Sequence, residues 1–278
     1  MRDPSLVYRH RLPVRIMHWI NVLALAILFM SGLMIFNAHP SLYWGKSSYT
    51  MDPPVLEIGI ANPEESPPEW RGMLRVGNTV FDTTGFLGLS KRDGQLNPVA
   101  FPAWLTIPSF YSLADARAWH FLFAWIFVIN GVTFLLYSLA SGHLRGDLWP
   151  SMADLRALPR SIVDHVRFRH PRGEAARRYN VLQKLAYLVV VFVLLPLIVL
   201  MGMAMSPALD AVLTGWVDWF GGRQSARTIH FIVAWLLVAF VLIHVFEVIV
   251  SGLWNHLRSM LTGWYRLPPE KSDKEPRP

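Results

Sequence analysis

The feature that most constrains this chain is a set of four long apolar stretches that contain no Asp, Glu, Lys or Arg. They cover residues 16–45, 118–144, 185–209 and 228–246. Each can supply the roughly 20 apolar residues that an α-helix needs to cross a hydrocarbon core of about 30 Å. Only 16% of the 278 residues are charged, whereas an ordinary soluble domain carries about 25%. The sequence therefore predicts an all-α integral membrane four-helix bundle, with spans at 16–36, 119–139, 185–205 and 229–250.

The basic residues indicate the orientation of the spans. Four arginines precede the first span, nine Lys or Arg lie between the second and third spans, and five follow the fourth. The other two connections share eight along a much longer stretch. The positive-inside rule therefore places both termini in the cytoplasm of a bacterium, with the chain in the cytoplasmic (inner) membrane. This asymmetry accounts for the net charge of +7. We expect the basic residues beside the spans to contact anionic lipid headgroups rather than nucleic acid.

Histidines in the spans are the candidate functional residues. The chain has no cysteine, which excludes thiolate iron–sulfur ligation and covalent haem attachment through C-x-x-C-H. An ionisable residue inside a bilayer is rare and indicates a functional site. Ordered by depth, the four intramembrane histidines form two pairs, His120 with His230 near the periplasmic face and His18 with His244 near the cytoplasmic face.

The spacing of His230 and His244 strengthens this interpretation. Fourteen residues advance a helix by about 21 Å and return to within about 40° of the starting direction. One helix can then supply a ligand to each of two stacked, non-covalent b-type haems. An iron held by two imidazoles has no open position, which suits electron transfer, and four-helix bundles build such sites between facing helices. Gly32 either leaves room for the upper haem or reflects the frequency of glycine in membrane helices.

Two alternative roles for the histidines are weaker. The rings could form hydrogen bonds between helices without any metal, but four histidines that match in pairs by depth favour ligation. A zinc site would need tetrahedral ligands at one level, and no Cys, Asp or Glu joins either pair.

Short motifs around the spans resemble a known family. They are His18-Trp19, Trp119-His120 and the sequence Tyr-Asn-x-x-Gln-Lys at Tyr179, Asn180, Gln183 and Lys184. Together with the fourth-span histidines, they resemble bacterial cytochrome b561-type di-haem membrane subunits, such as those of nickel–iron hydrogenases, formate dehydrogenases (the gamma subunit) and thiosulfate-reductase-like complexes. The resemblance covers residues 8–36 and 115–260. It implies the same pairing of histidines as their depths do.

The resemblance also implies a quinone site near the cytoplasmic-side haem. Asn180, Gln183 and Lys184 offer hydrogen-bond donors at about that level. The alternative is that the first two residues cap the third helix and that Lys184 extends its ammonium group to the membrane interface.

Residues 37–115, which we call the cap, are far longer than a connection requires and contain nine prolines. We expect a periplasmic cap that docks a soluble oxidoreductase partner; a lid that shields the upper haem from water is the alternative. Residues 36–45 and 101–109 resemble segments of cytochromes that accompany periplasmic molybdenum-cofactor oxidoreductases, which implies a partner of that class. Residues 1–268 form one domain in this interpretation, and the charged, proline-rich tail at 269–278 is disordered.

The favoured function is therefore a haem-iron cytochrome b of a respiratory chain that passes electrons between the quinone pool and a periplasmic partner. It would act as an electron-transfer subunit of an oxidoreductase complex, not as a catalyst by itself. The alternatives are a self-sufficient haem oxidoreductase acting on superoxide or ferric iron, and a bundle without redox function.

Overall fold

The structure is a computed structural model that describes residues 5–48, 52–61, 70–92, 94–142, 144, 149–167 and 180–268. It is mostly helical, and four of the described helices are long and apolar enough to cross a membrane. The prediction of four spans is thereby confirmed. The predicted disordered tail at 269–278, Tyr179 of the motif and residues 168–178 of the connection between the second and third spans lie outside the described residues.

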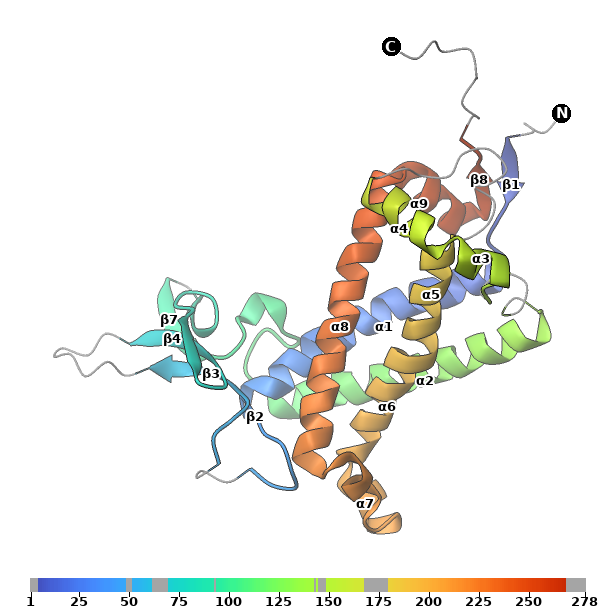
Figure 1. Ribbon diagram of the computed structural model, residues 1–278. Helices are drawn as coiled ribbons and strands as arrows, with labels where there is room; N and C mark the ends of the chain where they lie inside the picture. Colours follow the sequence, from blue (N-terminus) through green and yellow to red (C-terminus); the bar gives the residue numbers. More distant parts are fainter. Residues whose placement is uncertain are drawn as a thin grey trace. The chain divides into compact units, whose positions relative to one another are not determined.

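The four spans are long helical segments, which are labelled in Figure 1. They are α1 (Leu12–Asn37), α2 (Leu113–Ala140), a third segment over Val181–Ala204, and α8 (Arg223–Val250). Each begins four to six residues before the predicted span. The first turns of the helices carry charged residues such as Arg15, Asp115 and Arg223. The predicted spans leave these turns out because they were drawn within stretches without charged residues. Such turns are expected at headgroup level, outside the hydrocarbon core.

The third span is interrupted by a π-helical turn. It consists of α5 (Val181–Val189), the π-turn η4 (Val190–Leu194) and α6 (Leu195–Ala204). Pro196 in the first turn of α6 has no N–H to donate to the carbonyl four residues earlier, so regular α-helical bonding cannot continue through it. A π-helical turn is a known way to absorb such an interruption, and it is frequent at functional sites.

The chain divides into two compact units, and each span contributes one end to each unit. The first unit contains Met1–Ile20, Asn130–Pro196 and Leu236–Pro278, and the second contains Asn21–Ile129 and Leu197–Trp235. His18 and His244 therefore belong to the first unit, whereas His120 and His230 belong to the second.

The first unit adds short elements to the span ends. They are the helices α3 (Met152–Arg156), α4 (Leu158–Val166) and α9 (Leu253–Thr262), and the antiparallel strands β1 (Leu6–Tyr8) and β8 (Trp264–Arg266). Arg15 of α1 donates to the Leu261 carbonyl oxygen at 2.7 Å, and Trp19 donates to that of Met260 at 3.3 Å. These bonds attach α9 to the beginning of α1.

The second unit contains the cap, and here the all-α prediction is wrong. The cap contains β2 (Ser41–Leu42), β3 (Leu56–Ala61), β4 (Arg71–Val76), β5 (Thr79–Asp82), β6 (Gly88–Arg92), β7 (Gln95–Val99) and the 3-10 helix η1 (Ala103–Leu105). Strands β2 to β5 form one antiparallel sheet in chain order, and β6 pairs with β7.

Local sequence accounts for these strands. Val76 pairs with Thr79 across a two-residue connection, Gly77-Asn78, in which Gly77 has φ +57°, and such pairs of residues favour tight hairpins. Gly88 lets the β6–β7 hairpin approach the larger sheet, because a Cβ at this position would lie 1.9 Å from the Gly59 carbonyl oxygen. Only glycine permits so close an approach of two backbones.

The cap shares a hydrophobic core with the end of α1. The buried residues of this core are Leu33, Phe36, Leu42, Ile58, Ala100 and Phe101. A second core joins α6 and the start of α8 to the connection that contains α7 (Pro207–Val212) and the 3-10 helix η5 (Trp216–Phe220); its buried residues are Met201, Ala204, Val217 and Ala226. The cap is thus packed into the unit that holds His120 and His230.

Candidate functional site

His120 on α2 and His230 on α8 lie side by side in the second unit. Their ring centroids are 6.3 Å apart and their planes are inclined at 59°. Both residues are half-buried and lie on apolar helices. The depths of the two residues in their spans predict this pair, and the structure brings the two rings together.

We assign the proton of each ring from the contacts of its Nδ1 atom. His230 Nδ1 lies 2.9 Å from the carbonyl oxygen of Ile198 on α6, and because a carbonyl can only accept, Nδ1 donates. His120 Nδ1 lies 3.1 Å from Ser31 Oγ. The Ser31 hydroxyl itself donates to the carbonyl of Ile27 at 2.6 Å, so Oγ accepts from Nδ1. The backbone carbonyl of Leu28 is a further acceptor for the His120 ring. Both rings therefore keep the Nε2 lone pair for another partner.

His18 on α1 and His244 on α8 form the corresponding pair in the first unit. Their centroids are 6.4 Å apart and their planes are inclined at 69°. Aromatic neighbours hold both rings, because Trp19 meets His18 edge to face at 5.4 Å and Phe240 stacks on His244 at 5.9 Å. Among the residues that the structure describes, neither ring has a hydrogen-bond partner, in contrast to the pair in the second unit.

Two glycines lie against the imidazoles of the second-unit pair. A Cβ at Gly32 would lie 3.5 Å from His120 Cε1, and a Cβ at Gly202 would lie 3.4 Å from His230 Cε1. Gly32 therefore provides space for the ring of His120, which is a more specific role than the predicted space for a haem. Gly202 has the matching role opposite His230. Gly202, Ser31 and the Ile198 carbonyl were not among the residues predicted from the sequence.

Both pairs fit a metal held between two imidazoles. Imidazole–metal bonds are about 2.0–2.1 Å long, so two rings on opposite sides of one metal have centroids roughly 6 Å apart. The observed separations are 6.3 and 6.4 Å. Within the described part of the chain, no group of three or more His, Asp or Glu side chains is arranged to hold a metal ion. The donor set is thus two imidazoles per site, a set that could hold a haem iron.

Asn180 and Gln183, the predicted quinone donors, form a capping box at the start of α5. Asn180 Oδ1 accepts from the Leu182 N–H at 2.8 Å and from the Ser161 hydroxyl at 2.7 Å. Gln183 Oε1 accepts from the Asn180 N–H at 3.2 Å. Because both side-chain oxygens accept hydrogen bonds within the capping box of α5, the amide NH₂ groups are left to donate elsewhere. The two residues can therefore cap the helix and still offer donors.

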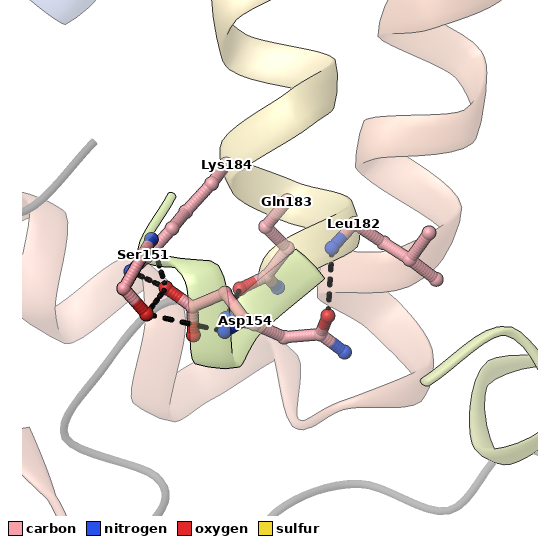
Figure 2. Close-up of polar contacts among 6 residues, drawn as sticks. Ser151, Asp154, Leu182, Gln183 and Lys184 are labelled. Carbon is pink, nitrogen blue, oxygen red and sulfur yellow. Dashed lines mark hydrogen bonds and ion pairs between the residues drawn. The ribbon is translucent and has the colours of Figure 1, made fainter. Parts of the chain in front are cut away.

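Lys184 is buried and pairs with a carboxylate that was not predicted from the sequence. Its Nζ lies 2.9 Å from Asp154 Oδ2 on α3, as Figure 2 shows. The same oxygen accepts from the Ser151 N–H at 2.8 Å and from the Ser151 hydroxyl at 3.0 Å. The hydrogen bond from Lys184 and then those from Ser151 lower the pKa of Asp154 to about 2. Lys184 thus holds α3 against α5 through an ion pair. Its role as a quinone donor and the alternative, an ammonium group at the membrane interface, stay predictions.

The first turns of α8 bind the beginning of the cap through the polar side chains and the backbone N–H groups of α8. Arg227 donates to the carbonyl oxygens of His39 and Ser41, the latter at 2.9 Å. The Gly45 carbonyl accepts from the N–H groups of Gln224 and Ser225 at 3.0 and 3.2 Å, which satisfies donors that a helix start leaves unpaired. Burial and then the charge of Arg227 lower the pKa of His39. The helix that carries His230 therefore also anchors the cap.

Comparison with known proteins agrees with this architecture. The family model described as prokaryotic cytochrome b561 matches residues 9–263. A protein of Azospira oryzae is 25% identical over 232 residues, which cover 84% of this chain and 85% of the relative, and it is named as a candidate subunit, YedZ1, of a protein-methionine-sulfoxide reductase. No solved structure matches the chain. The chain belongs to the prokaryotic cytochrome b561 family and is an integral membrane cytochrome b, a haem b electron-transfer subunit.

Proposed function

We propose that this chain binds two haems b, one between His18 and His244 and the other between His120 and His230. The observation that carries the proposal is that two imidazole pairs of matching separation, 6.4 and 6.3 Å, share the single helix α8. When bound, each haem takes up and releases one electron at its iron. At each site two imidazoles would hold the iron and leave no position for a substrate, which favours electron transfer over chemistry at the metal.

We further propose that the His18–His244 haem exchanges electrons with the quinone pool at the cytoplasmic side of the inner membrane. The cytoplasmic placement of this end of the spans is supported by the basic residues, nine of which lie either between α2 and α5 or in the first turn of α5. Asn180 and Gln183 supply the donors for the quinone oxygens through their amide NH₂ groups, which the capping box leaves available. The Lys184–Asp154 pair holds the α5 terminus that carries them.

The His120–His230 haem then serves a periplasmic oxidoreductase partner that docks on the cap. Two observations support this part. Arg227 and the first N–H groups of α8 attach the cap to the helix that carries His230. The Azospira relative is named as a candidate reductase subunit, which favours a complex over a self-sufficient enzyme. A molybdenum-cofactor partner stays a prediction.

The haem and quinone parts can be tested by one spectroscopic experiment. The purified protein is treated anaerobically with duroquinol, and absorbance is followed against a dithionite-reduced sample. We expect b-type bands that appear with duroquinol. A preparation without such bands in dithionite would contradict the haem proposal, and bands that form with dithionite but never with duroquinol would contradict the quinone proposal.

Two conservative variants separate quinone binding from helix capping. Asn180→Asp and Gln183→Glu keep the capping oxygens, since Asp and Glu occupy the same positions in capping boxes, but they delete the amide donors. We expect both variants to melt near the wild-type temperature and to be reduced more slowly by duroquinol. Ser161→Ala, which removes another contact to Asn180 Oδ1 without removing an amide, is the matched control. Wild-type rates in both variants would assign these residues to capping alone.

A further inference from the structure

Ser31 on α1 makes contacts that a serine in a membrane helix does not require for its own hydrogen bonding. Its side chain is fully buried, and its hydroxyl donates to the Ile27 carbonyl at 2.6 Å. That bond alone would satisfy the donor within the helix. The oxygen lies in addition 3.1 Å from His120 Nδ1, while the neighbouring Gly32 leaves the space that the ring occupies. The serine–glycine pair is thus arranged around one imidazole.

This arrangement gives a short chain of hydrogen bonds from His120 Nδ1–H through the Ser31 hydroxyl to the Ile27 carbonyl. A second ring nitrogen that donates to an acceptor makes the first nitrogen a stronger ligand, and it also fixes the ring orientation. A more electron-rich axial imidazole stabilises ferric iron relative to ferrous iron. Second-sphere hydrogen bonding of this kind is one of the main ways in which a protein adjusts a haem potential.

The two imidazole pairs differ in this respect. His120 donates to Ser31 Oγ, with the Leu28 backbone carbonyl as a further acceptor, and His230 donates to the Ile198 carbonyl. For His18 and His244, the described residues supply ring contacts from Trp19 and Phe240 but no hydrogen bond. A side chain can be replaced without disturbing the backbone, so Ser31 is the member of this network that mutation can address.

We propose that Ser31 is a positioning residue that acts through His120 to lower the midpoint potential of the haem held by His120 and His230. The proposal rests on the proposed function, because it requires a haem between these two rings. It adds a residue that sets the potential of one haem independently of the other.

The test is a spectroelectrochemical titration of the purified, haem-loaded protein. His120→Ala first identifies which of the two redox transitions belongs to the haem at His120 and His230. Ser31→Ala should then move that transition to higher potential and leave the other in place. At a fixed ambient potential, the ferric-to-ferrous ratio of that haem should fall about two- to tenfold, the size of one net hydrogen bond. Electron paramagnetic resonance should show a changed ferric signal for the same haem only.

Ser138→Ala is the matched control, because Ser138 is another buried serine of a span and its hydroxyl has no partner among the described residues. It should move neither transition. Ser31→Cys replaces Oγ by the larger Sγ, a weaker acceptor, and should move the same transition by a smaller amount. It carries the test if Ser31→Ala does not assemble.

The outcomes separate the two proposals. A wild-type protein without haem contradicts the proposed function. With two haems present, transitions that stay in place in Ser31→Ala and Ser31→Cys overturn the role of Ser31. Equal movement of both transitions, or the same movement in Ser138→Ala, also overturns it, because a general structural effect would then account for the change.

Discussion

The ion pair between Lys184 and Asp154 gives a prediction whose size depends on which partner is removed. The Lys184 side chain is 10% exposed and that of Asp154 is 30% exposed. Asp154→Ala therefore leaves an ammonium group buried without its counter-charge. Lys184→Met removes the charge that needs a partner, and it leaves Asp154 bound to Ser151 and partly in contact with water. The two changes break the same bond at different cost.

The expected free energies of unfolding follow from these exposures. Removing one partner of a fully buried pair costs about 3–5 kcal/mol, and partial solvation of this pair reduces the loss for Asp154→Ala to about 2–3 kcal/mol. Lys184→Met should cost about 0–1 kcal/mol, as for an exposed pair. At roughly 2–4 °C per kcal/mol for a chain of this size, Asp154→Ala should melt well below Lys184→Met, and the double variant should melt close to Lys184→Met.

The assay is thermal unfolding in detergent, followed by tryptophan fluorescence. Ser151→Ala, which weakens the cap of α3 but keeps both charges, measures the capping part of the loss. Because the pKa of Asp154 is lowered from 3.8 to about 2, the stabilisation by the pair is present above about pH 4 and is lost as the pH falls through 2. The difference between wild type and Asp154→Ala should therefore be constant from about pH 6 to 8. Equal losses in the two single variants, or a larger loss in Lys184→Met, would refute the reasoning.

Two further predictions concern the second unit. Gly32→Ala should retain both haems, measured by absorbance, because its Cβ would lie 3.5 Å from His120 Cε1, which is ordinary contact. The larger side chain of Gly32→Leu should displace the ring of His120, and this variant should lose one haem. Gly131→Leu is the control, since a Cβ there meets nothing within 4 Å, and an equal loss in this variant would contradict the prediction. Arg227→Met removes both bonds of the guanidinium to the cap backbone and should speed tryptic cleavage at Lys46 in limited proteolysis; an unchanged rate would show that other contacts hold the cap.

Much of the membrane architecture could be predicted from the sequence because the bilayer imposes a simple requirement. A span needs length and an absence of charge, and both are visible in the residues themselves. The pairing of histidines followed from depth alone, and the structure places His120 beside His230 and His18 beside His244. Their role as ligands stays a prediction.

The strands of the cap were not predicted because each covers only two to six residues. The Gly77-Asn78 hairpin was a local signal that could have been used. Other features leave no local signal. The acceptor for His230 is a backbone carbonyl, at Ile198, whose identity no side chain reveals. Asp154 and Lys184 are 30 residues apart in the chain, so only the fold brings them together.

The central claim is that α8 supplies one ligand to each of two haems, and haem content in four single variants tests it most directly. Each of His18, His120, His230 and His244 is replaced by Ala, haem per chain is measured by pyridine haemochrome, and the surviving redox transition is recorded. We expect two haems in the wild type and one in each variant, with His120→Ala and His230→Ala keeping one transition and His18→Ala and His244→Ala keeping the other. A single haem in the wild type, or a shared transition between variants of different pairs, would contradict the account.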